Sequence, residues 1–501
     1  MRNTSFFGHP RGLSTLFFTE MWERFSYYGL RPLLVLFMAA ALHDGGFGFD
    51  RTTASSIVGI YAASVYLASL PGGWIADRLW GLRKSIMIGA VLITIGHLAI
   101  ALSAVFSQTT FFIGLVFIVL GTGLLKPNIS AIVGDLYPEG GARRDGGFTI
   151  FYMGINIGSF LGQITTGLLG EKIGWHWGFG AAGVGMLFGL LWFYFRAPKT
   201  LDDLGLEAPS KHPDPKINIE QENKIKLGLW LFMAVLALVV GLSSFGVIEI
   251  NAVSLAHNMS YIMAFLAVVY FFYVFVMGGL NKNELKRVGV ILVLFLFSMI
   301  FWAAFEQAPT SLNLFASDFT NRVILGWEVP ALWFQSFNSF FIITLAPLFA
   351  ALWVTLSKNG INLSSPAKFS MGLAFTAIGF LLMIFAANIV VDGNGLIKVS
   401  ALWLIGSYFF QTVGELCLSP VGLSSMTKLA PKKFAGQMMG VWFFGTALGN
   451  LIAGIVGGKV NPENLQEMPQ LFQQTTLSLV IAAVILGLLV KPIQRMMQGD
   501  H

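Results

Sequence analysis

The sequence predicts an all-α polytopic membrane protein. Of its 501 residues, 55% are hydrophobic and 11% are charged, whereas soluble globular chains carry about a quarter charged residues. Apolar runs that exceed the roughly 20 residues needed to cross a bilayer as a helix recur from end to end. A backbone inside a bilayer must be helical or form a closed barrel. Barrel strands have about ten residues of alternating polarity, so these long runs exclude a barrel.

Fourteen membrane spans are expected. Their ranges are 14–42, 53–77, 84–106, 109–134, 146–171, 175–196, 227–248, 258–281, 288–317, 329–357, 367–391, 399–427, 433–458 and 471–492. The first six and the last six form two groups, which predicts an N-terminal six-helix bundle (1–196) and a C-terminal six-helix bundle (287–501). Residues 197–286 are expected to hold a polar cytoplasmic linker, from Lys199 to Lys226, and two extra helices. Two six-span halves are typical of transporters that alternate access by rocking one half against the other.

Basic residues predict the orientation of the spans. Both termini and one set of alternate loops carry most of the Lys and Arg, and the opposite loops carry only Arg51, Lys172, Arg322, Lys398 and Lys459. Since cytoplasmic loops are enriched in these residues, both termini are expected in the cytoplasm. Residues 1–12 contain no short apolar stretch with a cleavage site, so we expect no secretory signal to be removed.

The first span contains charges that are costly in a bilayer. Four ionisable residues lie within twelve positions: Glu20, Glu23, Arg24 and Arg31. On a helix, Glu20, Arg24, Arg31 and Tyr27 fall within about 60° of one another, with Glu23 and Tyr28 at the edges of that stripe. Each charge costs roughly 2.5 to 3.5 kcal/mol at mid-membrane, so pairing is expected. Glu20 and Arg24 are four residues apart in the favourable order, and Glu23 and Arg31 are expected to find partners on other helices.

Three further charges lie in other spans: Lys126 in the fourth, Glu306 in the ninth and Glu415 in the twelfth. With those of the first span they make four carboxylates against three cations. A surplus buried carboxylate is a natural proton carrier, because burial favours its neutral form and a mobile cation favours its ionised form. Alternatively, the pairs only hold helices together. Buried ion pairs stabilise weakly, however, and intramembrane ionisable residues are functional by default.

Four motifs spread over residues 20–420 resemble signatures of the proton-dependent oligopeptide transporter family, bacterial branch, within the major facilitator superfamily. They are Glu20-x-x-Glu23-Arg24-Phe25-x-Tyr27-Tyr28-Gly29, Gly73-Trp-Ile-Ala-Asp77-Arg78-Leu-Trp-Gly81-Leu-Arg83-Lys84, Phe151-Tyr152-x-x-Ile155-Asn156-x-Gly158-Ser159 and Glu415-Leu416-x-x-Ser419-Pro420. The resemblance implies the major facilitator fold with two extra central helices. It also implies a symporter of the bacterial inner (plasma) membrane that imports di- and tripeptides by alternating access, with protons as coupling ion and no other cofactor.

The chain departs from the family at two points. Phe334-Gln335-Ser336-Phe337-Asn338 is followed by Ser339 where the family has proline, which predicts an altered bend in the tenth span. The buried charges of the first half include no histidine, so a His-assisted proton route is not expected.

The charges suggest how a peptide would be held. Arg31 and Lys126 facing Glu415 would form a dipolar cavity for the two termini that every peptide shares, and the resemblance assigns the peptide carboxylate to the cations and its amine to Glu415. Asn156 and Asn338 are expected to hydrogen-bond the peptide amide, with the bracing of two helices as the alternative. Side-chain pockets are expected from Tyr27, Tyr28, Tyr66, Trp302 and Trp442.

Proton coupling is assigned to Glu20, Glu23, Arg24 and Glu306, and Arg31 is expected to pair with ionised Glu306. Arg51 and Asp318, at the outer ends of the second and ninth spans, are expected to pair as an external gate or to be simply solvated. A cytoplasmic charge cluster is expected to act as a conformational latch; its members are Asp77, Arg78, Arg83 and Lys84.

Other functions fit the sequence less well. A facilitator of nitrate or an amino-acid-like metabolite is the main alternative, but Glu415 would repel a purely anionic substrate. A drug exporter is disfavoured by the peptide-type motifs, and a receptor leaves the surplus carboxylate without a role. No nucleophile–base pair, metal cluster or phosphate-binding loop predicts an enzyme or an ATP-driven pump. The lone Cys417 excludes an intramolecular disulfide, and the basic residues report topology, so no nucleic-acid partner is expected.

Overall fold

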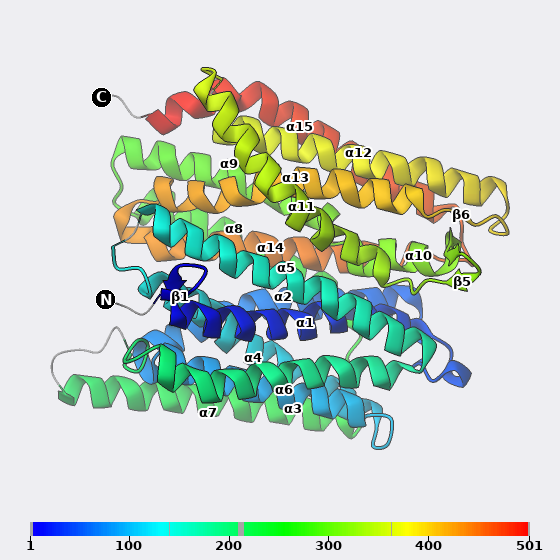
Figure 1. Cartoon of the computed structure of the whole chain (residues 1–501), viewed down its shortest axis with the longest axis horizontal. Helices are drawn as coiled ribbons and strands as arrows, with labels where there is room; N and C mark the ends of the chain where they lie inside the picture. Colours follow the sequence, from blue (N-terminus) through cyan, green and yellow to red (C-terminus); the bar gives the residue numbers. More distant parts are fainter. Residues whose placement is uncertain (1–3, 140, 209–214, 362, 499–501) are drawn as a thin grey trace. The chain divides into compact units, whose positions relative to one another are not determined.

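The predicted all-α fold is confirmed. The computed structural model describes residues 4–139, 141–208, 215–361 and 363–498. Its helices are α1 (Arg11–Ala39), α2 (Arg51–Ile75), α3 (Leu82–Leu102), α4 (Gln108–Asp135), α5 (Gly141–Lys172), α6 (Trp175–Thr200), α7 (Pro215–Ser244), α8 (Ala252–Met277), α9 (Lys282–Phe305), α10 (Asn313–Phe319), α11 (Trp333–Lys358), α12 (Ser365–Asp392), α13 (Leu402–Leu429), α14 (Ala435–Gly457) and α15 (Glu467–Gln498). All except α10 correspond to the fourteen expected spans (Figure 1).

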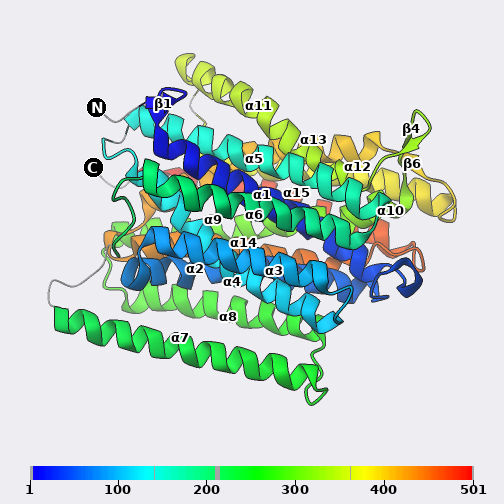
Figure 2. The ribbon, with the colours of Figure 1, turned by 60° about the horizontal axis from the view of Figure 1, so that its bottom comes forward.

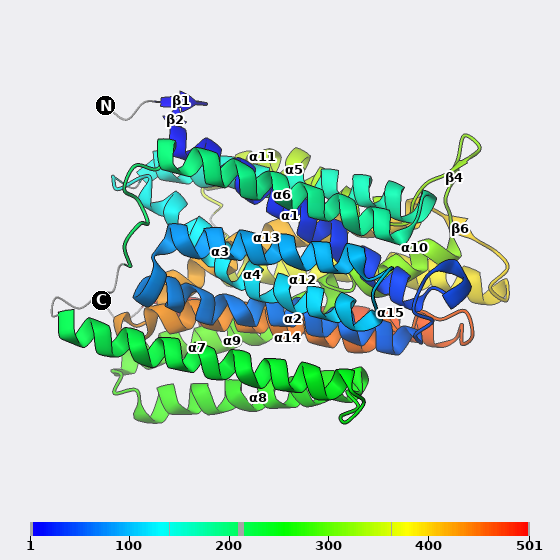
Figure 3. The same cartoon turned by 90° about the horizontal axis from the view of Figure 1, so that it is seen from below.

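Short strands lie only between helices or at the start of the described chain. Their bounds are β1 (Thr4–Phe6), β2 (His9–Pro10), β3 (Thr320–Asn321), β4 (Val323–Ile324), β5 (Trp327–Glu328) and β6 (Val399–Ser400). They form three two-stranded pairs: β1 with β2 and β4 with β5 antiparallel, and β3 with β6 parallel. The β1–β2 hairpin directly precedes α1 (Figure 3).

Three of the four family motifs lie on long helices that are not apolar enough to count as candidate membrane spans. Within the described residues, eleven helices are long and apolar enough to cross a membrane. The long helices outside that set are α1, α5 and α13, which contain the first-span charges, the Phe151–Ser159 motif and Glu415. Since polar groups in a bilayer are costly, the motifs lie on helices that need a polar interior to face.

The ninth span is interrupted, contrary to the single helix expected over 288–317. Helix α9 ends at Phe305, a π-helical turn covers Ala308–Leu312, and α10 continues from Asn313. Pro309 has no backbone N–H to donate to a preceding carbonyl, which explains the break. Glu306 therefore caps the end of α9 instead of lying within a regular helix. The tenth span, α11, runs through Ser339 as a continuous helix and contains Pro347.

The chain forms two compact units. Unit 1 comprises Met1–Leu33 and Ser64–Asn251, and unit 2 comprises Leu34–Ala63 and Ala252–His501. The boundary passes through α1 and α2, so the end of α1 and the first half of α2 pack with the C-terminal helices. A Cβ on Gly59 of α2 would lie 2.8 Å from Cα of Gly454 in α14. These two helices can approach so closely only because neither has a side chain at the crossing.

The same packing device occurs in both units. In unit 1, Gly89 and Gly96 of α3 face the backbone of Gly121 and Gly114 of α4, where an added Cβ would lie 2.6 Å from a carbonyl oxygen. Figure 2 shows this antiparallel pair side by side. Small residues seven positions apart let membrane helices pack closely along two turns.

In unit 2 the equivalent pair is α12 and α13. Gly372 and Gly379 face Gly414 and Ser407, with an added Cβ 2.8 Å from the facing carbonyl oxygen in each case. Helix α12 also packs on α15, as α3 packs on α6 in unit 1. The repeated spacing and pairing indicate that the two halves are built from one structural plan.

Candidate functional site

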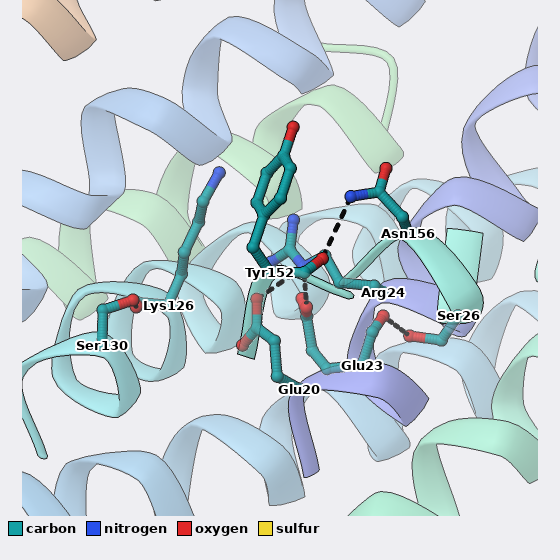
Figure 4. Close-up of polar contacts among 8 residues, drawn as sticks. All are labelled: Glu20, Glu23, Arg24, Ser26, Lys126, Ser130, Tyr152 and Asn156. Carbon is teal, nitrogen blue, oxygen red and sulfur yellow. Dashed lines mark hydrogen bonds and ion pairs between the residues drawn. The ribbon is translucent and has the colours of Figure 1, made fainter. Parts of the chain in front are cut away.

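Arg24 lies at the centre of the charges in α1. Its Nε is 3.0 Å from Oε1 of Glu20 and 2.5 Å from Oε2 of Glu23, and all three side chains are at most 3% exposed. The close-up in Figure 4 shows both carboxylates reaching the one guanidinium. The predicted Glu20–Arg24 pair is confirmed. The expectation that Glu23 pairs with another helix is wrong, because the guanidinium lies within reach of both carboxylates on its own helix.

Tyr27 and Tyr28 stack with the cations of α1. The guanidinium carbon of Arg24 lies 5.1 Å from the ring centre of Tyr27 and 6.0 Å from that of Tyr28, and that of Arg31 lies 5.6 Å from each. Tyr27 is buried and Tyr28 half-buried. Aromatic faces attract a cation without neutralising it.

Lys126 and Asn156 complete the predicted polar residues of unit 1. The Lys126 ammonium lies 4.3 Å from the ring centre of Tyr66 and is near enough to Glu20 for electrostatic attraction. Asn156 donates from Nδ2 to the carbonyl of Tyr152, one turn earlier in α5, at 3.0 Å (Figure 4). Its amide nitrogen is thus bonded within its own helix.

Close packing of α1 on α5 fixes this region. Thr166 of α5 donates its hydroxyl to the carbonyl of Gly29 in α1 at 2.9 Å. Gly158 and Gly162 of α5 lie against the backbone of Met21 and Phe25. Any side chain at these glycines would push α1 away from α5, so the motif glycines set the separation of the charged helix from the helix that carries Asn156.

Glu415 is held by an amide in unit 2. Asn338 of α11 donates from Nδ2 to Oε2 of Glu415 at 3.0 Å, and the same nitrogen lies 3.0 Å from Oγ1 of Thr412. The bonds connect α11 to α13, so Asn338 has the bracing geometry expected as the alternative to amide binding. Glu306 is buried and near enough to Glu415 for the two carboxyl groups to interact electrostatically.

The two predicted tryptophans of unit 2 are buried. Trp302 packs against the backbone position of Gly449 in α14, and the Trp442 ring lies 6.2 Å from that of Phe369. They lie on α9 and α14, and these helices pack together. The structure thus places both in the interior of the unit.

The predicted site charges are distributed unequally. Unit 1 holds Arg24, Arg31 and Lys126 against two carboxylates, Glu20 and Glu23, and unit 2 holds the carboxylates Glu306 and Glu415. In formal charge, this set gives unit 1 an excess of one positive charge and unit 2 two negative charges. The formal charge of this set therefore differs in sign between the two units.

Arg51 and Asp318 form an ion pair within unit 2. Nη1 of Arg51 lies 2.5 Å from Oδ2 of Asp318, with both side chains about one-fifth exposed, and also donates to the carbonyl of Val460 at 3.3 Å. The predicted pairing is confirmed, and the alternative of two solvated side chains is not. The pair ties the start of α2 to α10 and to the segment after α14.

Comparison with known proteins decides the family. The sequence profile described as PTR2, POT family, matches residues 83–471. The chain belongs to the POT family. A peptide transporter of Yersinia enterocolitica is 49% identical over 99% of this chain and 97% of its own length. A di-/tripeptide transporter of Lactococcus lactis subsp. cremoris is 35% identical over 99% and 98%.

A solved structure agrees with these relatives. The crystal structure of a peptide transporter POT in complex with sulfate superposes with a TM-score of 0.88 at 39% identity, covering 99% of this chain and 97% of that one. The predicted resemblance and fold class are therefore confirmed for this POT family member, and its relatives are transporters and not enzymes.

Some polar residues of this POT protein were not predicted. Thr412 shares Asn338 with Glu415, and Gln307 donates to Thr475 at 3.1 Å while accepting from Ser311 at 2.9 Å. Thr412 lies three residues before Glu415 and so on the same helix face, which is a signal that the sequence does contain. The partners of Gln307 are set by the π-helical turn, which charge patterns do not reveal.

In the cluster expected to act as a latch, Arg83 bonds to backbone carbonyls of the segment after α6. Arg83 donates from Nη1 to the carbonyl of Asp202 at 2.7 Å and from its backbone N–H to Gly205 at 2.8 Å. The first part of the expected linker therefore packs on the turn between α2 and α3. The latch role of the cluster remains a prediction.

Arg24→Gln should destabilise the protein by roughly 3 to 5 kcal/mol, because it leaves two buried carboxylates without their cation. Replacing Glu20, Glu23 and Arg24 together with glutamine should recover part of the loss, since no buried charge then remains. Thermal unfolding of the purified variants in one detergent measures both effects. Lys224→Gln, which removes an exposed partner of Glu220, is the control and should leave the midpoint unchanged. A wild-type midpoint for Arg24→Gln would contradict the central role of the guanidinium.

Proposed function

We propose that this protein is a proton-coupled symporter that imports di- and tripeptides by alternating access across the bacterial inner membrane. The observation that carries the proposal is the unequal charge of its two halves in a member of the POT family. Unit 1 supplies Arg31 and Lys126, and unit 2 supplies Glu415. Relatives named as a peptide transporter and a di-/tripeptide transporter support the same substrate class.

The charge distribution matches a zwitterionic substrate. Arg31 and Lys126 would bind the peptide carboxylate, with Arg31 able to form two parallel hydrogen bonds. Glu415 would bind the peptide amine, and the bond from Asn338 holds its carboxylate in place. Because every peptide has both termini, such a site tolerates many side chains. A purely anionic substrate such as nitrate would meet repulsion from Glu415.

The proposed proton carriers are the buried carboxylates. Glu20 and Glu23 share Arg24, and Glu306 lies at the end of α9, before the π-helical turn. Protonation of a carboxylate that shares a cation frees that cation for another anion. When a proton and a peptide favour the same conformational state, each increases the affinity for the other, and this coupling is reciprocal.

The proposed gate lies at the end of the protein that carries Arg51. The distribution of Lys and Arg supports a periplasmic position for this end and a cytoplasmic position for both termini. The ion pair with Asp318 connects α2, which begins in unit 2 and continues in unit 1, to α10. Opening this end would require the pair to separate.

Liposomes containing the protein should accumulate labelled dialanine when an inward proton gradient is imposed. N-acetylated or C-amidated dialanine should compete at least about tenfold less well, because a site charge is left buried and unpaired at a cost of roughly 1 to 3 kcal/mol or more. Glu415→Gln should reduce the discrimination against the acetylated peptide, and Glu463→Gln, at an exposed loop position, should not. Equal competition by free and blocked peptides would refute the proposed binding of both termini.

Glu23→Gln and Glu306→Gln should each abolish gradient-driven accumulation, because the replaced group can no longer bind or release a proton. Exchange of labelled for unlabelled peptide, which needs no net proton movement, is the second measurement and should survive in at least one of the two. Glu463→Gln again serves as the control. Accumulation at the wild-type level in both variants would remove these residues from the coupling mechanism.

The gate can be tested with Arg51→Cys combined with Asp318→Cys. A membrane-impermeant, cleavable bifunctional thiol reagent added to right-side-out vesicles should arrest uptake, and cleavage of the reagent should restore it. The two single variants, which keep the buried native Cys417, are the controls. Arrest obtained only in inside-out vesicles would reverse the proposed orientation, and cross-linking without arrest would exclude a gate.

A further inference from the structure

Helix α1 has an aromatic face opposite its charges. Trp22 lies between Glu20 and Glu23 in the motif but points about 200° around the helix from Glu20. Its ring lies 5.3 Å from that of Phe188, and the Phe18 ring one turn earlier lies 5.1 Å from that of Trp192. This face therefore packs on α6 and has no part in the charge cluster.

A groove remains between these two helices. It has a volume of about 440 Å³, and its lining residues are Trp22, Phe188, Leu191, Trp192, Phe195 and Arg196. Phe188, Leu191 and Phe195 are 52%, 42% and 59% exposed. The volume lies within the range of ligand sites, and the lining is aromatic and aliphatic except at one end. Such a lining suits a hydrocarbon chain.

One end of the groove is basic, because Arg196 lies there. The guanidinium carbon of Arg196 lies 5.4 Å from the ring centre of Trp192, and this contact holds the cation at the groove. Arg196 as a whole is exposed. A hydrogen bond of 2.8 Å between the hydroxyls of Thr15 and Thr200 joins the start of α1 to the end of α6. Two more exposed cations, Arg11 and Lys199, belong to the same two helix ends.

We propose that this groove binds an anionic phospholipid of the surrounding bilayer. The acyl chain would lie along the aromatic floor, and the headgroup phosphate would accept hydrogen bonds from Arg196, whose planar donors match phosphate. Aromatic side chains are typical of the membrane interface, and basic pockets between helix ends attract anionic headgroups. The six lining residues include a cation and no anion, so nothing in the lining matches the ammonium group of a zwitterionic lipid. The site is separate from the proposed peptide site and does not depend on it.

Titration of the purified full-length protein with phosphatidylglycerol, followed by native mass spectrometry, tests the proposal. Phosphatidylcholine with the same acyl chains and free glycerol phosphate are the comparison ligands. Phosphatidylglycerol should bind the wild type more tightly than phosphatidylcholine, and glycerol phosphate should not compete. Arg196→Gln should weaken phosphatidylglycerol binding about fivefold, the effect of one basic residue near a headgroup. It should weaken phosphatidylcholine binding less, because the choline ammonium offsets the charge of the phosphate that this lipid also carries.

Three further variants separate charge from packing. Arg196→Lys should retain the preference for phosphatidylglycerol in part. Leu191→Ser should weaken both lipids, because it removes exposed apolar surface from the groove. Lys172→Gln removes an exposed cation from the last residue of α5, near the start of α6 and far along that helix from Arg196. This variant should bind both lipids as the wild type does. Equal binding of both lipids by the wild type, an unchanged preference in Arg196→Gln, or competition by glycerol phosphate would each overturn the proposal.

Discussion

The free-energy cost of placing a charge inside a bilayer determines how the charged side chains of α1 are arranged. Three side chains of α1 are almost fully buried, and one guanidinium contacts both carboxylates, at 3.0 and 2.5 Å. The attraction between two buried charges offsets the free-energy cost of removing them from water only when their geometry is good and their remaining polar atoms are hydrogen-bonded. The surrounding structure supports this geometry: α5 approaches α1 through glycines, and the rings of Tyr27 and Tyr28 lie next to the cations.

Glu415 in unit 2 is also a carboxylate within a long helix, but the hydrogen-bond partner described for it is an amide and not a cation. Glu415 receives a hydrogen bond from Asn338, which Thr412 also shares. An amide can hold a carboxylate in position while leaving its negative charge intact, whereas an arginine would cancel it. The chain thus combines positive charge held by aromatic faces in unit 1 with negative charge held by an amide in unit 2. This combination is the physical basis of the proposed recognition of zwitterionic peptides.

Helix α1 serves two environments with one short motif. Glu20 and Arg24 face the polar interior, and Trp22, between them in the sequence, faces the groove with α6. A helix with 3.6 residues per turn can present both faces within four residues.

The sequence alone determined the spans, the buried charges and the family, because span length and apolar content are local properties and the motifs occupy contiguous positions. It also predicted the Glu20–Arg24 pair, whose spacing follows from helix geometry. Tertiary structure decided which partner each remaining group has. Glu23 shares Arg24 instead of pairing with another helix, Asn338 bonds Glu415, and a π-helical turn after Glu306 interrupts the ninth span. These outcomes depend on side-chain direction and on the distance between helices, and that distance is set by small residues such as Gly158 and Gly414 that face a backbone in the folded chain.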